Sequence, residues 1–256
     1  EHIDAVAKQD SRIRVIHQQN QKLPKALSNG FFAAEGEYLT WTSADNVMHP
    51  DFLSKMVGEL ENHPETGMVF ANINLIDEQG KYISDFGWYP HPQKPYTVRL
   101  PHNILELNTV ANNTVAAAFM YRSSVAAALE NYSYVRFTTE DYDYWMRIND
   151  LFNLRHVSFD EPVYDYRFHR NSLTAKDKEL KITENRYRLL CWDSFRREYL
   201  LKPLIWNVVD SFLNNRADIV AQFKKAMNDA GHRLIADDAE ERFLCQSDYT
   251  ATVYIG

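Results

Sequence analysis

One stretch of this chain, EGEYLTWTSADNVMHPDFL at residues 35–53, constrains the fold more than any other. It predicts a strand over residues 37–42, a tight turn that carries Asp45, and a helix that opens at Pro50. Proline suits a first helical turn because the N–H that it lacks has no partner there in any case. Proteins of the α/β class bind ligands outside the carboxyl end of a strand. A carboxylate on such a turn can hold a hard cation such as Mg²⁺ or Mn²⁺, which prefers oxygen ligands.

Strands and helices alternate along the chain to about residue 170, which predicts an α/β domain with a mostly parallel sheet. The expected strands cover residues 12–16, 37–42, 67–76, 114–121, 154–159 and 163–168. The expected helices in the same region cover residues 25–34, 50–62, 123–131 and 139–152. A turn at residues 77–80 leads into a hairpin arm at 81–86, and residues 87–103, which hold four of the nine prolines, form a loop.

The last third of the chain has a helical pattern. Helices are expected over residues 180–200, 208–213 and 219–230, and a strand over 248–255. The pattern therefore divides the chain into an α/β domain over residues 1–178 and a helical extension over residues 179–256, which could also link to a further domain.

Composition narrows the class of function. The formal net charge of −7 argues against a broad nucleic-acid surface. If an acidic protein of this kind binds an anionic ligand such as a diphosphate, it needs local positive charge, which a metal ion would supply. The two cysteines, Cys191 and Cys245, lack metal-ligand spacing and are expected to be reduced and buried, in a reducing compartment. No apolar run approaches the roughly 18 residues that span a bilayer.

The first stretch resembles the metal-binding segment of the inverting nucleotide-sugar glycosyltransferases of family 2, which have the Rossmann-like GT-A fold. In that family a Gly-Glu-Tyr strand runs into an Asp-x-Asp turn, with a proline five residues beyond the second Asp. Here Gly-Glu-Tyr at residues 36–38 leads to Ser-Ala-Asp at residues 43–45, and Pro50 keeps the spacing. The resemblance implies that Asp45 holds the metal ion. Ser43 stands where the family's first Asp touches the donor ribose.

A second motif is TTEDYDYWMRI at residues 138–148. By its pattern alone, a cluster of acids at a helix start complements the helix dipole and caps free N–H groups. The motif also resembles the family's acidic pair followed by an aromatic residue and an arginine, matched here by Glu140-Asp141, Trp145 and Arg147. The resemblance implies that Asp141 is the general base, that Glu140 binds substrate beside it, and that Arg147 is a structural partner of nearby acids.

A third motif is YDYRFHRNSLT at residues 164–174. A lone histidine at a strand end is usually a surface residue with satisfied hydrogen bonds. The Tyr-Arg-x-His pattern, however, resembles the family's segment after its last core strand. It implies that His169 is a further metal ligand and that Arg167 contacts the diphosphate. In the proline-rich loop, Trp88 is expected either to stack on an acceptor sugar or to anchor the loop.

The resemblance covers about residues 1–175, and it implies one departure from the family. Members begin with a strand, a helix and a second strand that carry most nucleobase and ribose contacts, and nothing of this pattern precedes residue 1. The resemblance therefore describes a chain without the family's N-terminal strands. For such a chain we expect weak donor binding and an open sheet edge.

The resemblance implies an inverting glycosyltransferase that uses Mn²⁺ or Mg²⁺ and moves a sugar from a nucleoside-diphosphate sugar, UDP in particular, to a saccharide acceptor. The implied setting is the synthesis of a bacterial surface polysaccharide or glycoconjugate in the cytoplasm, at the inner face of the membrane. One alternative is a non-catalytic saccharide-binding or scaffolding domain of a larger assembly, favoured by Ser43. Another is a nucleotidyltransferase, but that chemistry usually needs a glycine-rich phosphate loop near the N-terminus, which is absent here.

Overall fold

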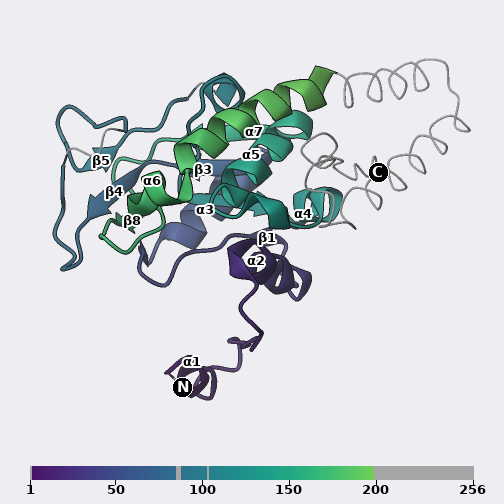
Figure 1. Cartoon of the computed structure of the whole chain (residues 1–256). Coiled ribbons are helices and arrows are strands. Elements are labelled where there is room, and N and C mark those ends of the chain that lie inside the picture. The colour runs from purple at the N-terminus through teal and green to yellow at the C-terminus, as the bar shows by residue number, and fades with distance from the viewer. Residues whose placement is uncertain (1, 85–87, 103, 199–256) are drawn as a thin grey trace, which may run out of the picture.

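The computed structural model describes residues 2–84, 88–102 and 104–198 (Figure 1). The expected helices over residues 208–213 and 219–230, the expected strand over 248–255 and Cys245 lie outside the described residues, as does the end of the hairpin arm at 81–86. The other expected elements can be compared directly with the structure. Cys191 is a free cysteine but is exposed, so the prediction that it is buried is wrong.

The helices lie close to the expected ranges. They are α1 (His2–Ala7), α2 (Lys22–Phe32), α3 (Phe52–Asn62), α4 (Ser123–Leu129), α5 (Glu140–Leu151), α6 (Asp177–Leu180) and α7 (Ile182–Arg196). Short 3-10 helices occur at η1 (Ile104–Asn108), η2 (Tyr134–Arg136) and η3 (Thr174–Lys176). The strands are β1 (Tyr38–Leu39), β2 (Val47–Met48), β3 (Thr66–Ala71), β4 (Ile73–Ile76), β5 (Thr97–Val98), β6 (Phe119–Arg122), β7 (Asn153–Val157) and β8 (Tyr164–Arg167).

The strands confirm the α/β class but not the parallel sheet. Among the described residues they form two four-stranded sheets, in the orders β1-β6-β3-β7 and β2-β8-β4-β5. The pairs β3–β7 and β4–β8 are parallel, and the other four pairs are antiparallel. The prediction of a mostly parallel sheet is therefore wrong for this region. A parallel pair needs a crossover connection, usually a helix, whereas the described chain between β4 and β6 contains only β5, loops and η1.

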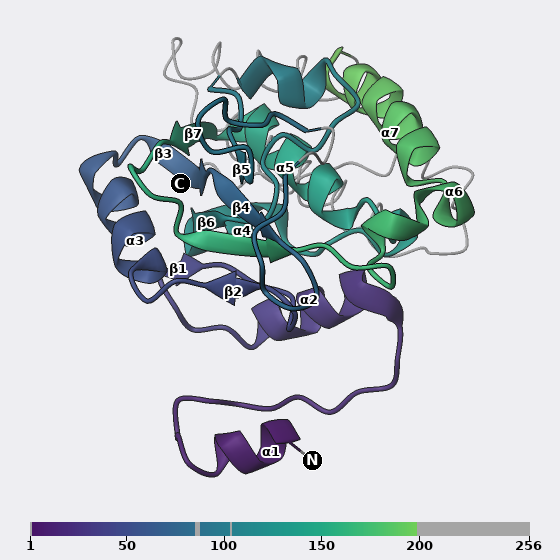
Figure 2. The same ribbon diagram turned by 90° about the vertical axis from the view of Figure 1, so that its left-hand side faces the viewer.

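Several expected strands are shorter in the structure, such as β1 and β6, and two differ in kind. Residues 12–16 form no strand, and Ile13 and Ile16 are 37% and 49% exposed, because no neighbouring strand of the described chain pairs with them. With α1, this stretch lies apart from the body of the domain (Figure 2). The expected strand over residues 67–76 is divided at Asn72, where the chain passes from one sheet to the other. The Asn72 side chain accepts a hydrogen bond from the Leu100 N–H at 2.8 Å.

Helix α5 lies at the centre of the core. Its residues 142–148 are all buried, and a helix buried on every side is surrounded by other elements. Trp145 packs against Phe119 of β6 with a centroid distance of 4.3 Å, and Tyr144 stacks on Tyr132 at 4.1 Å. This packing fixes the N-terminus of α5, where the acidic motif lies.

Helix α7 is joined to α5 through a buried ionic cluster. Arg196 donates to both Asp150 of α5 and Asp193 of α7, and each of these side chains is at most 2% exposed. Asp193 also accepts a hydrogen bond at 2.6 Å from the Asn108 side chain of η1. The division of the chain at residue 178 stays a prediction. The described part of the second segment, however, packs against the first.

Candidate active site

A pocket of about 330 Å³ lies where the ends of β1, β8 and α5 meet. Of the side chains that the sequence singles out, those that line it are Ser43, Asp45, Trp88, Glu140, Asp141 and His169. This volume is within the range of small-molecule sites. Arg167 does not line the pocket, so the structure brings together all of the predicted site residues except one.

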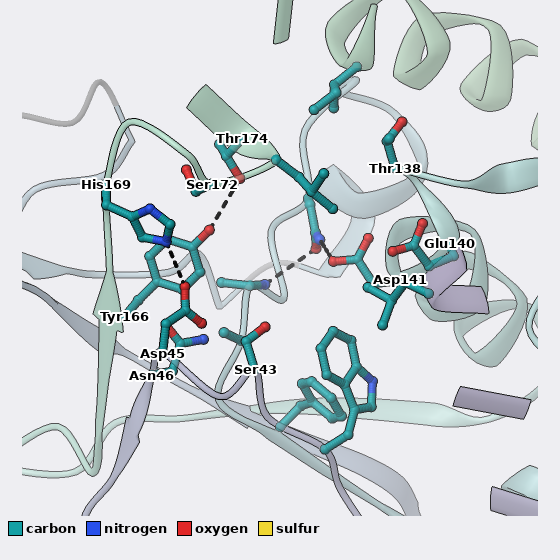
Figure 3. Close-up of a pocket in the computed structure, with 18 of the residues that line it drawn as sticks. Ser43, Asp45, Asn46, Thr138, Glu140, Asp141, Tyr166, His169, Ser172 and Thr174 are labelled. Carbon is teal, nitrogen blue, oxygen red and sulfur yellow. Dashed lines mark hydrogen bonds and ion pairs between the residues drawn. The ribbon is translucent and has the colours of Figure 1, made fainter. Parts of the chain in front are cut away.

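One side of the pocket carries a carboxylate and an imidazole that face each other (Figure 3). Asp45 follows β1 and His169 follows β8, and Asp45 Oδ2 lies 2.9 Å from His169 Nε2. The turn that carries Asp45 is closed by a hydrogen bond from the Asn46 N–H to the Ser43 carbonyl at 3.2 Å. The Asn46 side chain in turn donates to the Tyr164 hydroxyl at 3.0 Å. Both sheets therefore contribute to the position of Asp45.

The two facing side chains fit part of a divalent metal site. Ligand atoms at about 2.1 Å from an octahedral ion lie about 3 Å apart when they occupy neighbouring positions. The 2.9 Å separation between Asp45 Oδ2 and His169 Nε2 matches that spacing. In the part of the chain that the structure describes, no group of three or more His, Cys, Asp or Glu residues could hold a metal ion. The protein would therefore supply part of the coordination, and substrate or water the rest.

Arg167 holds the metal-side turn in place. Its Nε donates to the Asp45 carbonyl at 2.7 Å, and its Nη1 donates to the Asp77 carbonyl at 2.7 Å. The backbone N–H of Arg167 donates to the side-chain oxygen of Asn46 at 2.9 Å. The Nε and Nη1 atoms are therefore used within the domain, and the predicted contact of Arg167 with a diphosphate stays a prediction.

The opposite side of the pocket carries the acidic pair at the start of α5 (Figure 3). Asp141 accepts hydrogen bonds from the Asn113 side chain at 2.8 Å and from the Tyr142 N–H at 2.7 Å. Glu140 is only 4% exposed, and its Oε2 has no hydrogen-bond partner among the described residues. Thr139 occupies the N-cap position but makes no side-chain capping bond. Local contacts at the helix start therefore leave one oxygen of Glu140 without a hydrogen-bond partner among the described residues.

The backbone before the acidic pair is strained. Thr138 has a φ of 81°, a conformation that a β-branched residue rarely adopts. Its buried Oγ1 has no hydrogen-bond partner in the described chain, and the residue lines the pocket. Strain of this kind persists where the surrounding structure enforces it, often at functional sites. Thr138 and Glu140 thus leave two unpaired polar atoms at this side of the pocket, which suits a ligand with hydroxyl groups.

Burial separates the roles of the two carboxyl groups. Burial, together with the negative charge of Asp141, raises the pKa of Glu140 to about 8. Burial also raises the pKa of Asp141, but the positive charge of Arg186 and the hydrogen bonds from Tyr142 and Asn113 oppose that rise. At neutral pH Glu140 therefore keeps its proton, while Arg186 and the two hydrogen bonds favour the charged form of Asp141. Pairs of carboxyl groups in unlike environments are typical of acid–base sites.

We expect the Glu140→Gln variant to be more stable than the wild type at alkaline pH. The pKa of Glu140 is raised on folding, so its stabilising proton is fully present below the ordinary value of 4.5 and is lost as pH rises through about 8. The variant removes that loss, which between pH 5 and pH 9 is on the order of 4 kcal/mol at about 1.36 kcal/mol per pKa unit. Urea unfolding at pH 5 and pH 9 measures it. The exposed Glu61→Gln change is the control, and equal pH dependence in Glu140→Gln and wild type would contradict the assignment.

Sequence reasoning missed three pocket residues. Asn113 lies in a stretch without periodicity, so nothing marked it as the partner of Asp141. Arg186 is one of several arginines on α7, and Tyr166 was noted only as part of a motif. Tyr166 donates to or accepts from the Thr174 hydroxyl at 3.2 Å and lies 5.9 Å from the Trp88 ring. Trp88 therefore lines the pocket and also packs against Tyr166 of β8.

Fold and site together define an α/β protein with an acidic ligand pocket at the ends of its strands. The family model for Glycosyl transferase family 2 matches residues 1–129, half of the chain. The chain belongs to glycosyltransferase family 2, and this confirms both the resemblance and the GT-A type of α/β fold.

Curated relatives and solved structures show similarity at low identity. The chain is 25% identical to an uncharacterized glycosyltransferase of Haemophilus influenzae over 68% of this chain and 54% of the relative. It is 29% identical to the O-antigen biosynthesis glycosyltransferase WbnJ of Escherichia coli over 77% of this chain and 70% of the relative. The chain thus spans about half the length of the Haemophilus relative, and 30% of RC0461 of Rickettsia conorii.

Among solved structures, TarS 1-349 of S. aureus in complex with UDP-GlcNAc matches with a TM-score of 0.49 and 13% identity, over 89% of this chain and 67% of that one. This similarity is too low to transfer any property to the chain. In the part of the chain that the structure describes, no helix is long and apolar enough to cross a membrane.

Proposed function

We propose that this chain is an inverting glycosyltransferase that moves a sugar from a UDP-sugar to a saccharide acceptor. The observation that carries the proposal is the arrangement of one pocket, with Asp45 and His169 on one side and Asp141 on the other (Figure 3). The two sides suit the two ends of the reaction. A diphosphate leaves on one side, and a hydroxyl group attacks from the other.

Asp141 is the proposed general base. It accepts the proton of the acceptor hydroxyl while that oxygen forms a bond to the anomeric carbon. The bond from the anomeric carbon to the diphosphate breaks, and its electron pair leaves with the diphosphate. A single displacement of this kind inverts the anomeric centre. The hydrogen bond from the Asn113 side chain orients the Asp141 carboxylate for this step.

The other pocket residues bind substrate in this proposal. Protonated Glu140 donates a hydrogen bond from its unpaired oxygen to a sugar hydroxyl. Ser43 contacts the donor ribose, and Trp88 offers its ring face to the acceptor sugar. Arg167 acts indirectly, by holding the Asp45 turn.

Asp45 and His169 would hold Mn²⁺ or Mg²⁺. Such an ion neutralises negative charge that develops on a leaving diphosphate. The fit rests on the 2.9 Å spacing of the two ligand atoms and on the choice of a carboxylate and an imidazole, both of which suit Mn²⁺.

The proposed setting is bacterial polysaccharide or glycoconjugate synthesis, in the cytoplasm near the inner face of the membrane, with further domains in the same polypeptide. The name of the related WbnJ, an O-antigen biosynthesis glycosyltransferase of Escherichia coli, supports this setting. The second candidate, a non-catalytic saccharide-binding or scaffolding domain, is favoured by Ser43, which stands where the family has an acid. The two candidates differ in their need for a base, so the activity of an Asp141 variant separates them.

We expect Asp45→Ala to weaken UDP-dependent Mn²⁺ binding by at least about tenfold, because it removes the carboxylate ligand. Electron paramagnetic resonance of free Mn²⁺, titrated with the full chain in the presence and absence of UDP, measures this even when binding is weak. His169→Ala should show a smaller loss in the same direction. Asp160→Ala, which removes an exposed carboxylate outside the pocket, is the control. Equal Mn²⁺ binding by Asp45→Ala and wild type would refute the metal assignment.

A further inference from the structure

One guanidinium in the pocket wall, that of Arg186, has no hydrogen-bond or ion-pair partner in the part of the chain that the structure describes. Arg186 of α7 is half-buried and lines the pocket, and among the described residues it forms no hydrogen bond or ion pair. Its Nε is buried. By contrast Arg147, Arg167 and Arg196 all donate to carboxylate or carbonyl oxygens of the domain. A sheltered guanidinium without an acceptor is costly, unless a ligand provides the acceptor.

The helix that carries Arg186 is anchored on both sides of this residue. Near the start of α7, Ile182 is 5% exposed and also lines the pocket. The next residue, Thr183, is held by the Asp177 carboxylate, which accepts from its N–H at 2.6 Å and from its hydroxyl at 2.8 Å. Near the end of α7, Arg196 is buried in its ionic cluster with Asp150. Arg186 lies between these anchors and lines the pocket, so its side chain reaches the pocket from a helix that is held at both ends.

The surroundings of Arg186 show which side of the pocket it serves. Its charge acts on Asp141, whose carboxylate is already held by Asn113 and Tyr142 and makes no ion pair with the arginine. Helix α7 packs against α5, the helix that carries the acidic pair. Arg186 therefore adds positive charge on the side of Asp141, in a pocket where the other charged groups are acidic or imidazole.

We propose that Arg186 recognises a phosphate group of a substrate that enters this pocket. The planar guanidinium has donors spaced to bind two phosphate oxygens at once. The inference rests on the proposed function and names a chemical feature of its substrates. The phosphate belongs either to the nucleotide diphosphate of the donor or to a phosphorylated acceptor. Arg186 would bind a phosphate from either source in the same way. The two sources are distinguished by which ligand loses affinity when Arg186 is replaced.

Two probes distinguish the sources. Glycerol 3-phosphate represents an acceptor phosphate, and UDP with Mg²⁺, a diamagnetic ion that leaves the NMR lines sharp, represents the donor diphosphate. Each is titrated into the full chain at low ionic strength and followed by NMR line shifts. We compare wild type, Arg186→Gln and Arg186→Lys, with Arg188→Gln as the matched control. Arg188 lies two positions along the same helix, has a side chain that is 68% exposed, and pairs with Glu184.

The expected result is a loss of affinity of about tenfold or more in Arg186→Gln for one of the two probes, with no change in Arg188→Gln. A loss of affinity for glycerol 3-phosphate would show that Arg186 binds a phosphate of the acceptor. A loss of affinity for UDP would show that it binds the diphosphate of the donor. Arg186→Lys keeps the positive charge but not the paired donors, so its affinity should lie between those of wild type and Arg186→Gln. It also provides the test if the glutamine variant folds poorly. Unchanged affinity in both Arg186 variants, or a wild type that binds neither probe, overturns the inference. The Mn²⁺ response of Asp45→Ala still tests the proposed function separately.

Discussion

Asp141→Asn is expected to lower the rate of sugar transfer about 10²–10⁴-fold, the usual contribution of a positioned general base. Asparagine has the same shape and its oxygen can still accept one of the two hydrogen bonds that the carboxylate accepts, from the Asn113 side chain or from the Tyr142 N–H, so the pocket is expected to keep its overall form. What is lost is the ability to take a proton. Donor binding should change little because the metal side of the pocket, with Asp45 and His169, is untouched.

The measurement is single-turnover transfer by the complete polypeptide, together with UDP binding for the same variants. Asp160→Asn, an exposed carboxylate outside the pocket, serves as the control for loss of one charge. Near-normal turnover in Asp141→Asn would return Asp141 to a purely local role at the start of α5 and would favour the non-catalytic candidate.

The second large effect concerns stability. Arg196→Met is expected to reduce the free energy of unfolding by about 3–5 kcal/mol, because it leaves the buried carboxylates of Asp150 and Asp193 without their main partner. Burial raises the pKa of Asp150 to about 6 even with the arginines present. Protonation at lower pH removes part of the uncompensated charge, so the loss should be smaller at pH 5 than at pH 8.

Urea unfolding at the two pH values tests this. Arg188→Ala removes an arginine from the same helix, but one that is exposed and paired with Glu184, and should cost no more than about 1 kcal/mol. A cost for Arg196→Met as small as that of Arg188→Ala would show that the cluster does not hold α7 to α5.

The position of the site could be predicted because its residues lie at the ends of elements. Asp45 follows a strand, His169 follows another strand, and Asp141 begins a helix, so each is marked by a local pattern. These ends meet at one pocket once the sheets form. Arg167 had the same kind of local mark, yet its guanidinium is used by carbonyl groups of the Asp45 turn and the turn at Asp77. These carbonyl partners of Arg167 are distant from it in the sequence, so no local pattern could predict them.

Other features depend on long-range pairing. Strand direction is decided by which strands become neighbours, and alternation of strands and helices alone suggested crossovers that are missing between β4 and β6. The apolar residues at 13 and 16 matched a strand, but a strand also needs a partner. Arg186 and Asn113 become visible as pocket residues only after α7 and the loop before β6 are packed beside α5.

The ionic cluster on α7 also bears on how such a chain can be recombined with its relatives. On the side of the α/β domain, the polar contacts of the cluster come from Asp150 and Asn108. A chimera that takes α7 from another family member would bury these two side chains against new neighbours unless the donor helix also brings an acidic residue and an arginine at positions 193 and 196. A junction placed after residue 197 avoids the mismatch and keeps Arg186 facing its own pocket, so the segment up to that point should be exchanged as one cassette.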